Sequence, residues 1–365
     1  MTLVAALPGL GHPVVLGDLL VSSPRRATSI PQLNAPAVPD VNARLAVTSS
    51  YVVSAVARKL AILGGRLAIG FAGSAFAAKA VVKDLRTFVE RGTFQKSDLD
   101  AFLASLGPDY LGNQEVSLCG VLAVGDRMTF FGWDVEPFTT STGETVFACG
   151  TGANELKHML GALSYGDEGK QRERNPVAAS LLSVMGITGV LLGEQIRIGK
   201  NIDAFFGGGF EIVTPYDGAM HHIPVTYLFL EATITAANEM TITFHRVLTF
   251  DYHGDILLVY ALDPLIEDAK KEIYVLSPLY RSVTRSELDE FRRSHQAWPR
   301  TRLTCVYVYL PQAVEPRRIS VQSHFAGLKD PAVTIVEAPE MIELGLSEAL
   351  RSRMLQHAAE VCGIR

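Results

Sequence analysis

The sequence contains few cysteines for its length, and they are widely separated. Four cysteines lie among 365 residues, and no two of them form a CxxC pair. A disulfide framework needs an even set of closely spaced cysteines, and a structural zinc site needs paired thiolates, so neither is predicted. A reducing compartment is the expected setting. The four residues are Cys119, Cys149, Cys305 and Cys362.

The chain also lacks an excess of basic residues. It carries 33 Lys and Arg against 38 Asp and Glu, for a net charge of -5. Binding to a nucleic acid backbone needs a clear surplus of cations on one face, so nucleic acid is not an expected partner. No basic stretch precedes the first apolar residues, and the apolar run 181–193 is too short to span a bilayer. We therefore expect a soluble cytoplasmic protein without a membrane partner.

What is present is a large apolar fraction, 48% of the residues, which can bury at least one large core. Two apolar runs, 3–6 and 13–16, flank "PGLGH" and predict a buried hairpin, and Gly64-Gly65 predicts a second hairpin. Ser74 is a candidate N-cap for a helix over 75–92, with Phe76, Ala80, Val81, Leu85, Phe88 and Val89 at helical spacing. Further helices are predicted over 153–166 and 175–199. The order of strands, helices and strands favours an α+β fold with helices on antiparallel sheets.

Two segments interrupt or extend this pattern. Residues 23–49 contain Pro24, Pro31, Pro36 and Pro39 and are predicted to be a surface insertion. From residue 225 onward the pattern changes to alternating strands, closed by a predicted helix over 341–362. We therefore expect a first domain over 1–224, with the insertion at 23–49, and a strand-rich C-terminal α/β extension of unknown role over 225–365.

Thr2 directly follows the initiator methionine. Methionine is trimmed before small residues, which would leave a threonine whose own α-amine lies beside its hydroxyl. An α-amine titrates at about 7.7 to 8.0 in model peptides, so it can act as a general base toward that hydroxyl. Such a nucleophile also needs a nearby cation, a carboxylate to hold the cation, and a backbone amide for the oxyanion.

The ordered motifs resemble a proteasome β-type subunit of the N-terminal nucleophile (Ntn) hydrolases, a family that includes bacterial proteasome-like peptidases. "GDLLVSS" resembles the family's D-x-x-x-T segment, and "KLAIL" with "GFAG" resembles its lysine strand and following glycine. "CGTGANELKHML" is similar to the G-S-G that opens a long helix. "NIDAFFGGGFEIV" resembles D-x-x-S-G-G, with Phe206 at the serine position. The resemblance covers about residues 2–220.

The resemblance implies a role for each matched residue. Thr2 would be the nucleophile, Lys59 the catalytic lysine, Asp18 its buried partner and the Gly70 amide the oxyanion donor. Thr151 and Asp203 would assist the amine, and Ser22 would contact substrate. The implied fold is a four-layer αββα sandwich of antiparallel sheets. The implied activity is threonine-dependent hydrolysis of a peptide or small amide by a homo-oligomer, without a cofactor or metal. The resemblance also leaves room for an unfoldase partner, whose identity is unknown.

Other interpretations of these residues stay open. The protein could be a non-catalytic scaffold or assembly subunit of the same fold, or a small-amide acylase. Lys59 could lie on the surface, and Thr151 could simply cap a helix. The glycine run 207–209 is not followed by Lys-Ser/Thr, which disfavours nucleotide binding, and His221, His222, His245 and His253 lack the spacing of metal ligands.

Overall fold

A computed structural model describes most of the chain: residues 2–25, 32–46, 49–92, 94–111, 114–162, 175–235, 237, 239–264, 271–311, 313, 319–325, 332–338 and 341–363. The chain forms two compact units. The first comprises 1–184, 199–223 and 276–283, and the second comprises 185–198, 224–275 and 284–365. The main division therefore falls between residues 223 and 224. Two segments cross it: 185–198 belongs to the second unit and 276–283 to the first.

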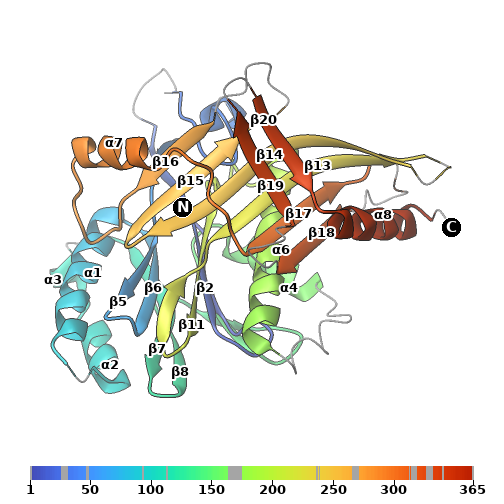
Figure 1. Cartoon of the computed structure of the whole chain (residues 1–365). Helices are drawn as coiled ribbons and strands as arrows, with labels where there is room; N and C mark the ends of the chain where they lie inside the picture. The colour runs from blue at the N-terminus through green and yellow to red at the C-terminus, as the bar shows by residue number, and fades with distance from the viewer. Residues whose placement is uncertain are drawn as a thin grey trace. The chain divides into compact units, whose positions relative to one another are not determined.

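The first unit is built on two antiparallel sheets (Figure 1). One has six strands in the order β12 (Ala219–His222), β11 (Phe210–Tyr216), β2 (Val14–Asp18), β1 (Val4–Leu7), β10 (Thr145–Cys149) and β9 (Pro137–Thr139). The other has four: β5 (Leu60–Leu63), β6 (Leu67–Gly73), β7 (Val116–Val124) and β8 (Arg127–Trp133). Both predicted hairpins, β1–β2 and β5–β6, are confirmed.

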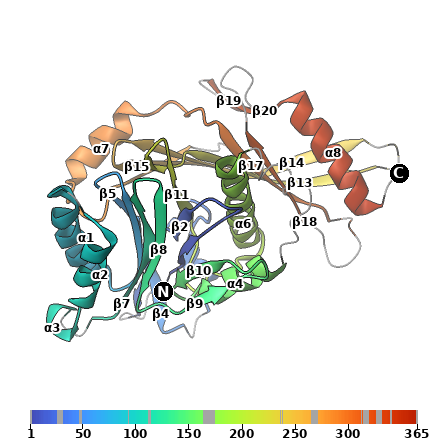
Figure 2. The same cartoon turned by 90° about the horizontal axis from the view of Figure 1, so that it is seen from below.

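A buried apolar layer joins the two sheets. Val4, Val15 and Val213 from the six-stranded sheet pack with Leu60 and Val121 from the four-stranded sheet. A second cluster fills the space between the four-stranded sheet and the helices α1 (Ala75–Glu90) and α2 (Lys96–Ala104). Figure 2 shows α1 and α2 on one side of the sheets and α4 (Ala153–Ala162) on the other. The short helix α3 covers Pro108–Leu111. The end of the helix predicted over 153–166 lies outside the described residues.

Helix α1 begins where the sequence predicted, because the Ser74 hydroxyl accepts a hydrogen bond from the Ala77 amide. Its buried face is narrower than predicted. Val81, Leu85 and Val89 are buried, but Phe76 and Phe88 are 82% and 50% exposed. The buried residues follow the i, i+4, i+8 stripe that faces the sheet, and the two phenylalanines lie outside it.

The Pro-rich insertion is partly buried, so its prediction as a surface segment was wrong in part. It leaves from β3 (Leu20–Pro24), returns as β4 (Tyr51–Val56) and contains a short 3-10 helix, Val41–Arg44. The buried Asn42 side chain donates to the Val53 carbonyl at 2.8 Å and accepts from the Val53 amide at 2.9 Å. These two bonds hold the middle of the insertion against β4. Residues 26–31, 47 and 48 lie outside the described part.

The second unit contains a six-stranded sheet. Its order is β16 (Glu272–Leu276), β15 (Ile256–Leu262), β14 (Met240–His253), β13 (Val225–Ile234), β17 (Leu303–Tyr309) and β18 (Ile319–Phe325). The pair β13–β17 is parallel, and the hairpin β19 (Val333–Ala338) and β20 (Met341–Leu346) forms a separate two-stranded sheet. Helix α7 covers Arg285–Ser294 and α8 covers Glu348–Cys362.

Helix α8 is shorter than predicted. The sequence predicted a helix over 341–362, but 341–346 form the strand β20, and Ser347 then caps the helix. Leu350, Met354 and Ala358 of α8 are buried in the core of the second unit. Mixed helices and mainly antiparallel sheets confirm the α+β class.

The structure corrects the prediction that the apolar run 181–193 is too short to span a bilayer, because this run lies within the longer helix α6 (Pro176–Ile198). Helix α6 has 23 residues, and by length and composition it is long and apolar enough to cross a bilayer. Within its most apolar window, 61% of the residues are buried inside the protein. A core helix of a soluble protein shows the same pattern.

Candidate active site

The first hairpin places Thr2 beside Asp18. Strands β1 and β2 are wholly buried, and their register pairs Val4 with Gly17. One step further along, the Asp18 amide donates to the Leu3 carbonyl at 2.9 Å, and the Leu3 amide donates to the Asp18 carboxylate at 2.9 Å. The start of the chain is therefore held against the end of β2 from both directions.

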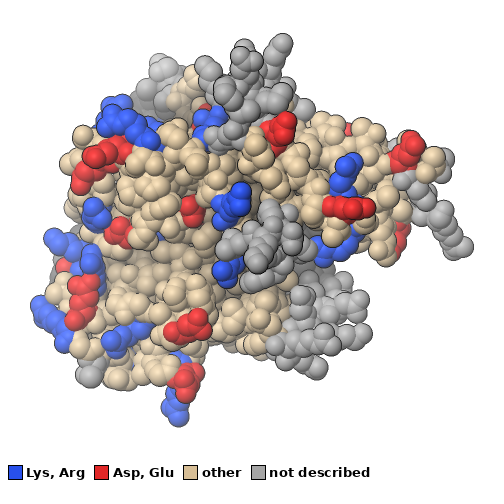
Figure 3. All heavy atoms as spheres, in the orientation of Figure 1, with Lys and Arg blue, Asp and Glu red and all other residues tan. Residues whose placement is uncertain are grey.

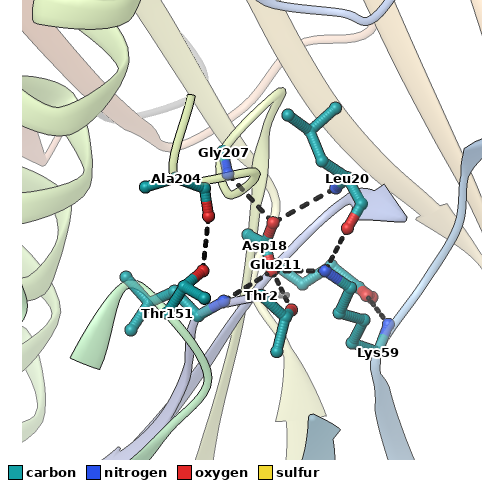
Figure 4. Close-up of polar contacts among 9 residues, drawn as sticks. Thr2, Asp18, Leu20, Lys59, Thr151, Ala204, Gly207 and Glu211 are labelled. Carbon is teal, nitrogen blue, oxygen red and sulfur yellow. Dashed lines mark hydrogen bonds and ion pairs between the residues drawn. The ribbon is translucent and has the colours of Figure 1, made fainter. Parts of the chain in front are cut away.

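The Asp18 carboxylate is the centre of the site (Figure 4). It is completely buried, and every hydrogen bond it accepts offsets the cost of removing its charge from water. Its Oδ1 accepts from Lys59 Nζ at 2.6 Å, and its Oδ2 accepts from the Gly207 amide at 2.9 Å. Its donors are the hydroxyl of Thr2, the ammonium of Lys59 and the amides of Leu3, Leu20 and Gly207.

Lys59 and Thr2 share one oxygen of this carboxylate. Both the Thr2 hydroxyl and the Lys59 ammonium donate to Asp18 Oδ1, and Lys59 also donates to the Leu20 carbonyl. The Lys59 side chain is 3% exposed, so the interpretation of Lys59 as a surface residue is wrong. Burial lowers the pKa of Lys59 below its ordinary value, and the attraction of Asp18 opposes that change.

A glycine turn supports Thr2 from the other side. The Gly152 amide donates to the Thr2 carbonyl at 3.0 Å. Gly150 has a φ of +88°, and a Cβ built on it would lie 2.2 Å from the Thr2 carbonyl oxygen. A side chain at Gly150 would therefore push against the backbone of Thr2. The turn between β10 and α4 fits around the proposed nucleophile.

Thr151 and Asp203 both form hydrogen bonds to the backbone of Ala204. The Thr151 hydroxyl donates to the Ala204 carbonyl, and the Asp203 carboxylate accepts from the Ala204 amide at 3.0 Å. Both residues are exposed. In the described part of the chain, the hydrogen bonds join neither side chain to Thr2. Their role in assisting the amine stays a prediction.

The roles predicted for Gly70, as oxyanion donor, and for Ser22, as a substrate contact, also stay predictions. Gly70 lies inside β6, with Leu60 and Cys119 as its cross-strand partners. A Cβ at Gly70 would lie 2.4 Å from Val4 Cγ1, so this glycine allows the two sheets to approach closely. Ser22 is half-buried in β3 and pairs with Val53.

Sequence reasoning missed three residues that complete the site. Gly207, with a φ of +110°, donates its amide to Asp18, and the site adds a second buried ion pair between Arg58 and Glu211 at 2.7 Å. A single glutamate inside the apolar "GFEIV" and an arginine directly before Lys59 were the available signals. A lone charge in an apolar strand is seldom buried without a partner.

The described residues contain no group of three or more His, Cys, Asp or Glu arranged to hold a metal ion. Figure 3 shows basic and acidic side chains interspersed on the face that it draws. Among the coloured side chains, neither sign forms a broad patch on that face.

Comparison with known proteins identifies no family. No family model matches the chain, and no curated protein matches it significantly. Among solved structures, it is similar to eukaryotic HslV from Trypanosoma brucei, at 16% identity and a TM-score of 0.33, covering 57% of this chain and 97% of that one. It is also similar to an Anbu (Gly-1) mutant from Hyphomicrobium sp. strain MC1, at 10% identity and a TM-score of 0.32, covering 61% and 86%. HslV and Anbu are proteasome-like proteins.

Proposed function

We propose that the first unit is an Ntn-type αββα sandwich and that the protein is a threonine-dependent amide hydrolase, with peptides as the favoured substrates. The observation that carries this proposal is the buried cluster in which the Thr2 hydroxyl and the Lys59 ammonium share Asp18 Oδ1. A lysine buried with an aspartate beside a penultimate threonine is costly as a structural device. It supplies the cation and carboxylate that such a nucleophile needs.

The reaction follows from these groups once Met1 has been removed. Thr2 Oγ1 attacks the scissile carbonyl carbon, and its proton passes to the α-amine of Thr2. The Lys59 ammonium favours the alkoxide by charge, and Asp18 holds Lys59 in place. The α-amine gives the proton to the departing amine, which leaves an ester between Thr2 and the acyl group. Water then attacks that ester and frees Thr2 with the acid product.

The remaining predicted residues complete the proposal. The Gly70 amide would hold the oxyanion, Ser22 would contact the substrate, and Thr151 with Asp203 would position the amine. A peptide chain or a small amide can reach the same acyl-enzyme, so a small-amide acylase is the alternative enzyme. Retention of Met1 would favour a non-catalytic subunit, because a blocked amine cannot act as the base.

Two measurements on one sample test the nucleophile. Intact-mass spectrometry should show loss of one methionine residue. An epoxyketone, which reacts with an N-terminal threonine, should then add once to the wild type and leave Thr2→Ala unmodified. Thr87→Ala is the matched control, because it removes an exposed threonine hydroxyl on α1 and leaves the N-terminus unchanged. Equal labelling of Thr2→Ala would contradict the assignment, and a retained Met1 would favour the scaffold.

A further inference from the structure

A second buried ion pair lies directly beside the first. Arg58 and Lys59 are consecutive, and their side chains are 1% and 3% exposed. They bind different carboxylates: Lys59 binds Asp18 at the end of β2, and Arg58 Nε binds Glu211 Oε1 on β11 at 2.7 Å. Strands β2 and β11 are neighbours, with Glu211 opposite Gly17.

Glu211 also holds the backbone from which Lys59 extends. Its Oε2 accepts from the Lys59 amide at 3.3 Å, a contact visible in Figure 4. One side chain therefore fixes both the guanidinium of Arg58 and the main chain at the start of β5.

His222 on β12 completes the network. Its Nε2 lies 2.9 Å from Arg58 Nη2. Burial, together with the charges of Arg58 and His221, holds the pKa of His222 well below its usual range. The neutral imidazole can accept a hydrogen bond from the guanidinium, which satisfies a second side of Arg58.

A buried ion pair is weak evidence of stabilisation, since apolar residues of similar size often replace one at no cost. Its place next to Lys59 points to another use. We propose that Glu211, held by Arg58 and His222, is a positioning residue that fixes the Lys59 backbone and so aims the Lys59 ammonium at Asp18 and Thr2. This inference rests on the proposed function, because it assigns Glu211 a role in the same reaction.

The charge of Glu211 adds a measurable consequence. Burial lowers the pKa of Lys59, and the charges of Asp18, Cys149 and Glu211 oppose that change. Replacing Glu211 with glutamine removes one of the opposing charges, so the pKa of Lys59 should fall further. The Lys59 ammonium would then lose its proton at a lower pH, and the alkaline limit of Thr2 reactivity would move to lower pH with it.

The test compares Glu211→Gln with Glu194→Gln. Glu194 is the matched control, because it pairs with Arg197 at 3.1 Å in the second unit. Lysine labelled with carbon-13 at Cε reports the titration of Lys59, whose signal is identified by its loss in Lys59→Arg. In Glu211→Gln the midpoint should fall by roughly half a pH unit or more. Epoxyketone labelling of Thr2 should slow by about tenfold or more. Glu194→Gln should change neither.

A second variant keeps the test decisive if Glu211→Gln does not fold. The double variant Arg58→Met/Glu211→Met removes the whole pair and leaves no unpaired charge. It should melt near the wild-type temperature, yet label slowly, because the Lys59 amide has lost the carboxylate that holds it. The Lys59 midpoint is not compared in this variant, because the two charges removed have opposite signs and opposite effects on the pKa of Lys59. A wild-type labelling rate in the folded double variant would overturn the inference. If the wild type itself is not labelled, the proposed function fails, and the Lys59 midpoint alone decides the role of Glu211.

Discussion

At the scale of single residues, the site depends on how four buried charges are paired. Asp18 with Lys59 and Glu211 with Arg58 form two ion pairs, with side chains at most 3% exposed. Burial of either partner alone would carry a large desolvation cost. The Asp18 carboxylate accepts hydrogen bonds from five donors, and these bonds offset the cost of burying its charge. Removing one charge should therefore destabilise the protein more than a surface substitution would.

Lys59→Met tests this expectation. The substitution leaves the buried Asp18 carboxylate without its cation, and the free energy of unfolding should fall by about 3 to 5 kcal/mol. Lys96→Met is the control, because Lys96 pairs with Asp100 at 2.5 Å but its side chain is 52% exposed. Its cost should stay below about 1 kcal/mol. Urea unfolding measures both values. An unchanged midpoint with full epoxyketone labelling of Lys59→Met would show that Lys59 is not the catalytic lysine.

At the scale of elements, two glycine-containing turns bring distant segments to the end of β2. The turn at Gly150–Gly152 contacts the Thr2 backbone, and the loop before β11 presents the Gly207 amide to Asp18. Both turns use a positive φ that disfavours other residues. The geometry of Thr2 therefore depends on backbone that lies far from it in the sequence.

Gly150→Ala should displace Thr2. The added Cβ would lie 2.2 Å from the Thr2 carbonyl oxygen, at a φ of +88°. Gly143→Ala is the matched control, since Gly143 has a φ of +83° and an added Cβ would meet nothing within 4 Å. Both variants should lose about 1 to 3 kcal/mol from backbone strain. Epoxyketone labelling should drop in Gly150→Ala alone, and equal labelling of the two variants would argue against a tight fit around Thr2.

At the scale of the whole molecule, the second unit lies almost entirely outside the part of the chain, about residues 2–220, that resembles a proteasome β-type subunit. Its six-stranded sheet, the hairpin β19–β20 and helix α8 form a core of their own. The resembled family acts as rings of subunits that hide their sites. We propose that this protein also self-associates, but in a smaller or differently arranged oligomer, because the second unit adds a large body to each subunit.

Multi-angle light scattering on the purified full chain tests that proposal. The expected mass is that of a few subunits, each of 39.6 kDa. The measurement should be repeated over a range of concentrations, because association follows mass action. A closed ring of six or seven subunits would contradict the proposal and would indicate that the second unit lies outside the assembly contacts.

The sequence predicted the elements whose signals are local. The Ser74 cap, the Gly64-Gly65 turn and the apolar runs of β1 and β2 each depend on neighbouring residues, and each is confirmed. The errors occurred where the conformation or burial of a segment depends on a partner outside that segment. The strand β20 was taken for the start of a helix because a short apolar run fits either period until its partner β19 is known. The burial of Asn42 depends on Val53, which a Pro-rich pattern cannot indicate.

For the site, the sequence by itself determined which residues are proposed to carry the chemistry: a penultimate threonine, an acid after an apolar strand, and a lysine before another. The tertiary structure decided how they are paired. Lys59 and Asp18 are separated by 41 positions, and Arg58 and Glu211 by 153. Partners at such distances are chosen by how strands align within and between the sheets, and a single sequence does not record that alignment. Glu211 and Gly207 therefore became part of the site only when β11 was placed beside β2.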